Sequence, residues 1–298
     1  MNKILFFLTG GLLLGGCSLT ERTDLEVSPK PTLTVAYRCL NDQGVNVAND
    51  EVEGMDIFVF DPAGRFLRRM EADRRTVTDP AGVRLLEGVP PGLYTVAAYA
   101  NANRLVLPEL VPGESVADDL IVAEHGRDTC PDADRLLHSF DRFEVRRGEP
   151  TVQRAELSRR YFRVELTITG AEHLGVSAER IAVLFTGIPA GVDCEGDPLD
   201  ERTVFSPRLE ATPQGFAASF GVYRFRPKDD VRMIVRAADE TVAQVDLGEY
   251  IAQRIPEVDL RNDREITLPI HIDITSAGIA VSIEDWNGQQ VQLPVIGE

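Results

Sequence analysis

The sequence is poor in the residue patterns that carry catalysis or metal binding. Its 298 residues include four cysteines, and none of them forms a Cys-x-x-Cys pair, which argues against a redox centre or a zinc site. The four histidines, His125, His138, His173 and His271, are scattered without the spacing of metal ligands. No Gly-x-Ser-x-Gly elbow and no glycine-rich phosphate loop occurs. The sequence therefore predicts no enzyme, no cofactor and no metal centre.

Lysine is also scarce, and acidic residues dominate the charge. Only Lys3, Lys30 and Lys228 occur, and 48 acidic residues bring the net charge to −17. Such a chain repels nucleic acid and anionic lipid, so neither is an expected partner. The many carboxylates show no spacing that favours a catalytic pair over a chance one.

One acidic segment, "DCEGDPLDE" (193–201), is faintly similar to a calcium loop because Asp193, Glu195 and Asp197 alternate. Its glycine comes early, Pro198 stiffens the turn, and no bidentate glutamate follows at the required offset. The segment is therefore predicted to be a solvated acidic loop.

Tryptophan occurs once, at Trp286, and aromatic residues make up only 7% of the chain. Sugar-binding platforms usually stack ligands on exposed tryptophan and tyrosine rings. Trp286 ends an apolar strand pattern, so we expect it to fill a core. A glycan-binding surface protein nevertheless remains an alternative function.

The chain also lacks an apolar run of the roughly 20 residues that span a bilayer. Its longest such run, Ile4 to Leu14, follows Lys3 and ends at Leu14-Gly15-Gly16-Cys17, the pattern of a secretory signal. Leu-Gly-Gly-Cys resembles the bacterial lipobox, in which the cysteine is acylated and becomes the first mature residue. We therefore expect a lipoprotein signal peptide at 1–16 and a lipid at Cys17, with an ordinary signal peptide as the alternative. Two or three acyl chains hold a protein stably on a membrane.

The residues that follow predict a tether and then strands. Residues 17–31 are polar, contain two prolines and show no period, as in a flexible tether. Beyond them, apolar residues alternate with period two, which is typical of β-strands. Strands are expected at 33–40, 55–61, 88–101, 161–169, 180–189, 216–225, 231–238, 266–275 and 278–287. Helical turns are expected only at 115–122 and 247–254. The run "MDIFVFD" (55–61) is apolar on both faces, as in a strand buried inside a sandwich.

Many short strands over this length favour two β-sandwiches in series, at 32–157 and 158–298. Export implies an oxidising compartment, so a disulfide is permitted. Cys39 and Cys130 both fall in the first sandwich, and we expect them to pair, leaving Cys194 over.

The parts in this order resemble the FimB/Mfa-type fimbrial subunits of Bacteroides-like bacteria, and among them the membrane anchor. Besides Cys17, five stretches carry the resemblance: "LTVAYRCL" (33–40), "VEGMDIFVFDPAGRFLRR" (52–69), "LLEGVPPGLYTVAAYAN" (85–101), "LLHSFDRFEVRRGEPTVQRAELSRRYFRVELTITG" (136–170) and "IAVSIEDWN" (279–287). Two positions depart from the family pattern. Tyr99 stands where many members have tryptophan, and Arg159-Arg160 replaces the usual Arg-Asn pair.

The resemblance implies two transthyretin-like β-sandwich domains, no catalysis, and fimbrial stalk or accessory subunits as partners. Members join by β-strand addition, in which an extended segment completes a sheet edge of another subunit. The implied role is a lipid-anchored basal subunit at the outer membrane surface, which attaches fimbriae and limits their length. Contacts are expected at sheet edges, including 279–296. An accessory or tip subunit is the alternative within this class. Proteolytic removal of a leading segment, as in stalk subunits, is not expected, because it would sever the lipid.

Overall fold

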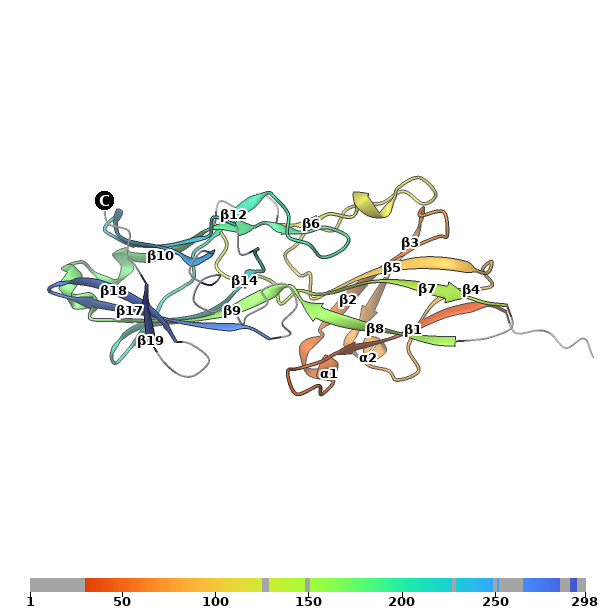
Figure 1. The fold of residues 1–298 in the computed structure, drawn as a ribbon, viewed down its shortest axis with the longest axis horizontal. Coiled ribbons are helices and arrows are strands. Elements are labelled where there is room, and N and C mark those ends of the chain that lie inside the picture. Colours follow the sequence, from red (N-terminus) through yellow and green to blue (C-terminus); the bar gives the residue numbers. More distant parts are fainter. Residues whose placement is uncertain are drawn as a thin grey trace, which may run out of the picture.

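A computed structural model describes residues 30–124, 129–147, 151–226, 229–248, 251, 265–284 and 290–293. Strands make up 56% of the described residues and helices 9%, which confirms the predicted all-β class. Figure 1 shows an elongated molecule in which an N-terminal and a C-terminal set of strands lie along the long axis. In the described parts of the chain, no helix has the length and apolar character needed to cross a bilayer.

The N-terminal sandwich is built from seven strands. They are β1 (Thr32–Cys39), β2 (Gly54–Phe60), β3 (Phe66–Asp73), β4 (Val83–Glu87), β5 (Gly92–Ala100), β7 (Leu137–Val145) and β8 (Thr151–Arg159). Their order is β3-β2-β5-β7-β8-β1-β4. β8 pairs in parallel with β1 along its length, but it meets β7 only at Leu137–Arg159 and His138–Ser158. The sheet therefore bends at this corner into two halves that enclose one core.

Short helices occupy connections in this half of the molecule. α1 (Ala48–Glu51) follows β1, and α2 (Arg74–Val77) follows β3. The side chain of Asp73 caps α2 by accepting a hydrogen bond from the backbone N–H of Thr76 at 2.8 Å.

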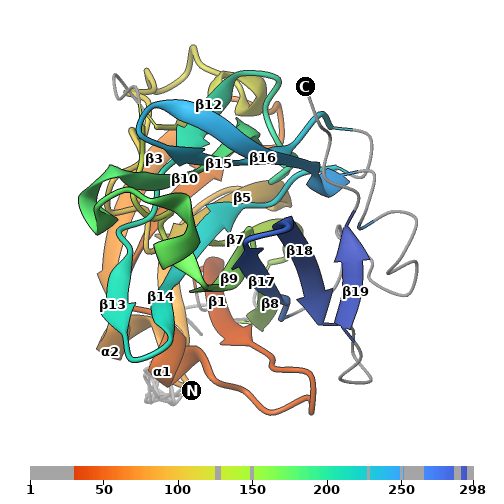
Figure 2. The same ribbon diagram turned by 90° about the vertical axis from the view of Figure 1, so that its left-hand side faces the viewer.

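The C-terminal sandwich packs a six-stranded sheet against a four-stranded one (Figure 2). The six-stranded sheet has the order β13 (Glu210–Thr212), β14 (Gly215–Tyr223), β9 (Tyr161–Thr169), β17 (Thr267–Thr275), β18 (Gly278–Glu284) and β19 (Gln290–Leu293). The four-stranded sheet has the order β12 (Arg202–Phe205), β10 (Ile181–Pro189), β15 (Arg232–Ala237) and β16 (Glu240–Asp246). Two 3₁₀ turns, η2 (Ala171–Leu174) and η3 (Ala178–Arg180), precede β10.

The long segment between β5 and β7, here called the excursion, leaves the N-terminal sandwich and packs against the C-terminal half of the chain. It contains the 3₁₀ turn η1 (Ala117–Asp119), within the expected helical turn at 115–122, and β6 (Val122–Ala123). β6 pairs with β11 (Gly191–Val192) of the C-terminal half. Farther along, the backbone of Cys130 hydrogen-bonds with Val204 and Ser206 beside β12. The excursion is therefore part of the junction between the sandwiches.

The alternating patterns of the sequence match the observed faces. Phe162, Val164, Leu166 and Ile168 of β9 are all buried, as predicted. In β2, Ile57 and Val59 face the N-terminal core, while Phe58 and Phe60 belong to a second core that continues into the C-terminal sandwich. The interpretation of 55–61 as a strand buried on both faces is confirmed.

The expected Cys39–Cys130 disulfide is wrong for this structure. Cys39 is a buried free thiol in the N-terminal core, whereas Cys130 is buried in the other core. The sheet that contains β2 and β5 lies between these two cores, so its thickness keeps the sulfur atoms apart. Cys194 is also a buried free thiol.

Candidate functional site

The two sandwiches meet where β8 runs into β9, with Arg160 alone between the two strands. The backbone N–H of Arg160 donates to the Leu136 carbonyl at 2.8 Å, and its carbonyl accepts from Arg224 at 3.0 Å. The crossing is therefore fixed by backbone bonds on both sides. The sequence-based boundary after 157 falls in the last residues of β8.

The loop at 193–197 of the C-terminal half docks on the N-terminal sheet at this crossing. The hydroxyl of Tyr99 donates to the Asp193 carbonyl at 2.8 Å, and Nε2 of His138 donates to the Cys194 carbonyl at 3.0 Å. The Tyr99 and His138 rings lie 4.9 Å apart. A guanidinium N–H of Arg160 points at Nδ1 of His138 at 3.5 Å. Burial and the nearby Arg160 charge lower the pKa of His138 to about 3, so its ring is neutral.

The acidic segment predicted to be solvated is therefore packed in part. One carboxylate oxygen of Asp193 accepts hydrogen bonds from the backbone N–H groups of Glu195 and Asp197, both at 2.9 Å. Cys194 and Gly196 are buried against the first sandwich, because that face offers Tyr99 and His138 as partners. Among the described residues, no three His, Cys, Asp or Glu side chains gather as metal ligands.

The other expected residues are dispersed. His173 is exposed in η2 and His271 is half-buried on β17. Cys17, His125 and Trp286 lie outside the described residues, as do most of the tether and parts of 279–296 and 247–254.

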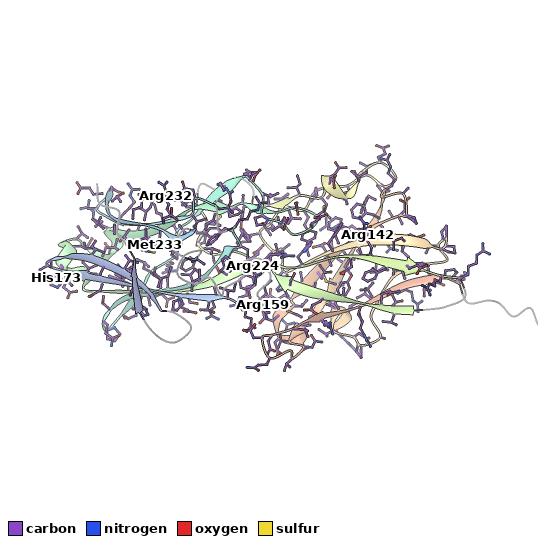
Figure 3. All side chains as sticks on the ribbon, in the orientation of Figure 1. Arg142, Arg159, His173, Arg224, Arg232 and Met233 are labelled. Atoms are coloured by element: carbon purple, nitrogen blue, oxygen red, sulfur yellow. The ribbon has the colours of Figure 1, made fainter. Side chains whose placement is uncertain are left out.

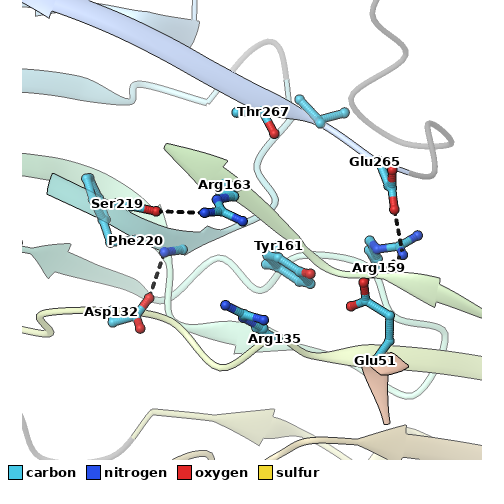
Figure 4. Close-up of a pocket in the computed structure, with 12 residues that line it drawn as sticks. Glu51, Asp132, Arg135, Arg159, Tyr161, Arg163, Ser219, Phe220, Glu265 and Thr267 are labelled. Atoms are coloured by element: carbon cyan, nitrogen blue, oxygen red, sulfur yellow. Dashed lines mark hydrogen bonds and ion pairs between the residues drawn. The ribbon is translucent and has the colours of Figure 1, made fainter. Parts of the chain in front are cut away.

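A cavity of about 240 Å³ opens at the junction, between β8, β9, β14, the start of β17 and the excursion (Figure 4). Arg159 forms its most buried wall, with 4% of the side chain exposed. Its Nη2 atom lies 2.9 Å from a carboxylate oxygen of Glu265 and 3.4 Å from one of Glu51. These ion pairs join the C-terminal sheet to α1 of the first sandwich.

The sheet edges differ in charge. Charged residues occur on five of the six strands at the ends of the three larger sheets: Arg68, Arg69, Glu71 and Asp73 on β3, Arg84 and Glu87 on β4, Arg202 on β12, Glu210 on β13, and Glu240 and Asp246 on β16. Charges of this kind protect an edge strand from pairing with other chains. The sixth strand, β19, reads Gln-Val-Gln-Leu and has none.

Comparison with known families identifies the chain. The family model of the fimbrillin-A-associated anchor proteins Mfa1 and Mfa2 matches residues 21–291. The chain belongs to this family. It is a fimbrial, cell-surface structural protein rather than an enzyme, as the sequence predicted. No curated protein matches the chain in sequence.

Solved structures share the fold of this family member over nearly its whole length. The fimbrial anchor protein Mfa2 from Porphyromonas gingivalis has a TM-score of 0.70 at 13% identity, over 89% of this chain and 100% of that one. A candidate adhesin from Bacteroides thetaiotaomicron gives 0.72 at 15% identity, over 90% and 100%. A candidate polysaccharide-binding protein from the same species gives 0.71 at 16% identity, over 90% and 98%. These likenesses show the β-sandwich fold.

Sequence reasoning missed the contacts of the junction. Tyr99 and Asp193 are 94 positions apart, and His138 and Cys194 are 56 apart, with no motif that relates them. The only available signal was Tyr99 itself. Many family members have tryptophan at this position, and tyrosine brings a hydroxyl group that tryptophan lacks.

Proposed function

We propose that this fimbrial protein is the basal anchor, acylated at Cys17, that holds the fimbrial shaft on the outer membrane and limits its growth. The family to which it belongs is described by its anchor proteins, which supports the role. The lipobox-like Leu14-Gly15-Gly16-Cys17 segment supports the lipid.

The placement of the two ends supports an anchor. β1 enters the N-terminal sandwich at the end of the long axis far from the C-terminal sheets, and β19 belongs to the opposite sandwich (Figure 1). Residues 18–31 would span at most about 50 Å if extended. A lipid at Cys17 would thus hold one pole at the membrane and direct the other toward the shaft.

The proposed contact with the next subunit is strand addition at the C-terminal edge, on β19, because β18 is already paired on both sides. A sheet edge exposes unpaired N–H and C=O groups that an extended segment can bond. The observation that carries this choice is the absence of charge on β19, where every other end strand of the larger sheets has at least one charged residue. The partners would be stalk or accessory subunits.

Gene deletion tests the anchor role. Without a basal anchor, we expect long fimbriae to be shed into the medium, and expression of the intact gene to restore short, attached ones. A Cys17→Ala variant should leave the membrane fraction and fail to restore attachment. If the deletion leaves fimbriae attached at normal length, the protein is an accessory or tip subunit and the anchor proposal is wrong.

A further inference from the structure

The cavity at the junction has the size and the wall chemistry of a small-ligand site that subunit contact does not require. Its volume of about 240 Å³ equals roughly eight water molecules at about 30 Å³ each, which is room for one sugar ring. Side chains from several separate elements converge on it (Figure 4).

The wall offers both hydrogen-bond donors and acceptors. Arg163 donates from Nη2 to the Ser219 hydroxyl at 3.2 Å, and Nε of Arg163 bonds the Glu165 carboxylate at 2.5 Å. Asp132 uses one oxygen to accept from the Gly221 backbone N–H at 2.6 Å, and no bond to a described residue is seen for its other oxygen. Guanidinium and carboxylate groups therefore alternate around the cavity.

Tyr161 and Arg135 add an aromatic surface and a cation. Tyr161 lies half-buried in the wall, and Figure 4 shows the Arg135 guanidinium directed toward it. Among the described residues, Arg135 has no carboxylate within ion-pair distance, whereas Arg159 is paired with Glu51 and Glu265. Arg135 is therefore the cation of this cavity that can accept an anionic group from a ligand.

We propose that this cavity binds the terminal sugar of a carboxylated glycan, such as a uronic acid. Sugar hydroxyls both donate and accept, so they can pair with Asp132 and with the arginines at once. The Tyr161 ring would pack on the sugar face, and Arg135 would pair with the carboxylate in a charge-assisted bond. An acidic peptide side chain would pair with the arginines, but it has no hydroxyl groups to donate to Asp132 and Glu51. The carboxylates of these two residues would therefore repel it. The site does not depend on the anchor role.

Ligand-observed NMR and titration calorimetry on the full-length protein in a polyoxyethylene detergent test this site. The probes are methyl glucuronide, methyl glucoside as its neutral match, and an acetylated glutamate-rich peptide. We expect the glucuronide to bind best. Arg135→Gln should weaken the glucuronide about tenfold and the glucoside little, whereas Tyr161→Ala should weaken both.

Arg142→Gln is the matched control, because Arg142 is an exposed arginine on β7 that Figure 3 places in the first sandwich, away from Arg159 and the junction. It should bind like the unmodified protein. Thermal melts establish that each variant is folded. The proposal fails if the unmodified protein binds no sugar, if Arg135→Gln and Tyr161→Ala bind like Arg142→Gln, or if the acidic peptide binds more tightly than the glucuronide.

Discussion

The hydroxyl of Tyr99, on β5 of the first sandwich, donates a hydrogen bond of 2.8 Å to the backbone carbonyl of Asp193 in the second. The tyrosine is fully buried, and burial raises the pKa of its hydroxyl well above the usual value, so it stays protonated as a donor. This bond and the neighbouring one from His138 hold the 193–197 loop against the N-terminal sheet, and together they are called the clasp.

Removing that hydroxyl should loosen the clasp without changing the fold. We expect Tyr99→Phe to lower the free energy of unfolding by about 1 kcal/mol, because a buried carbonyl loses its partner. Hydrogen exchange at 193–197 should accelerate. Tyr94→Phe is the control, because its hydroxyl bonds the Pro90 carbonyl at 2.8 Å inside the first sandwich. Equal exchange at 193–197 in both variants would contradict the clasp.

Replacing Gly196 by alanine tests the same contact, because it adds a methyl group where the docked loop leaves no room for one. It has a φ of +79°, and a Cβ there would collide with the His138 ring and the Arg160 guanidinium. Gly113 has a φ of +80° with nothing near such a Cβ. We expect Gly113→Ala to destabilise by about 1–2 kcal/mol through backbone strain alone. Gly196→Ala should add roughly 1–3 kcal/mol of overpacking. Denaturant unfolding measures both, and equal losses would show that the loop is not tightly docked.

The neutral state of His138 predicts a pH dependence of stability. Its pKa is about 3 in the folded protein, while an unfolded histidine binds a proton near pH 6.5. Between these values the unfolded state holds the extra proton, so stability falls as the pH falls through that window. The slope from this residue is up to about 1.4 kcal/mol per pH unit. In His138→Gln, whose amide can still donate to the Cys194 carbonyl, the unfolding free energy should vary less steeply from pH 6.5 downward. An unchanged slope would show that His138 is not held neutral.

Local pattern was enough to predict β1, β2, β5, β9, β10, β14, β15, β17 and β18, because apolar residues alternate along one face of a buried strand. It did not predict the other strands of the described residues, which include β4, β8 and β16 as well as β3 and β7. In β3, Arg68 and Arg69 are adjacent and interrupt the alternation, as suits a charged edge. In β7, Ser139 and Asp141 stand at the inward positions between Leu137 and Phe143, so the apolar face is broken.

The junction could not be predicted because its partners are distant in the chain. The acidity of 193–201 suggested a solvated loop, and only the fold brings it to Tyr99 and His138. The pairing of Cys39 with Cys130 failed for the same reason. Position in the first half of the chain did not reveal that the excursion carries Cys130 into the second core.

A charge on the uncharged edge strand should block strand addition. We expect Val291→Lys to reduce recovery of fimbrial subunits with the affinity-purified protein at least tenfold, because an edge lysine resists being covered by a partner. Gln244→Lys adds the same charge to β16, which already has Glu240 and Asp246, and should leave recovery unchanged. Loss of recovery in Gln244→Lys alone would place the contact on the other sheet.

Site-specific photo-crosslinking in living cells tests the contact most directly, and the scarcity of lysine makes ordinary amine crosslinkers a poor choice. A photoreactive amino acid replaces Val291 on β19 in one strain and Gln244 on β16 in another. Our account predicts that position 291 crosslinks to a fimbrial stalk or accessory subunit and that position 244 does not. Crosslinks from position 244 only, or none from 291 in cells that bear attached fimbriae, would contradict it.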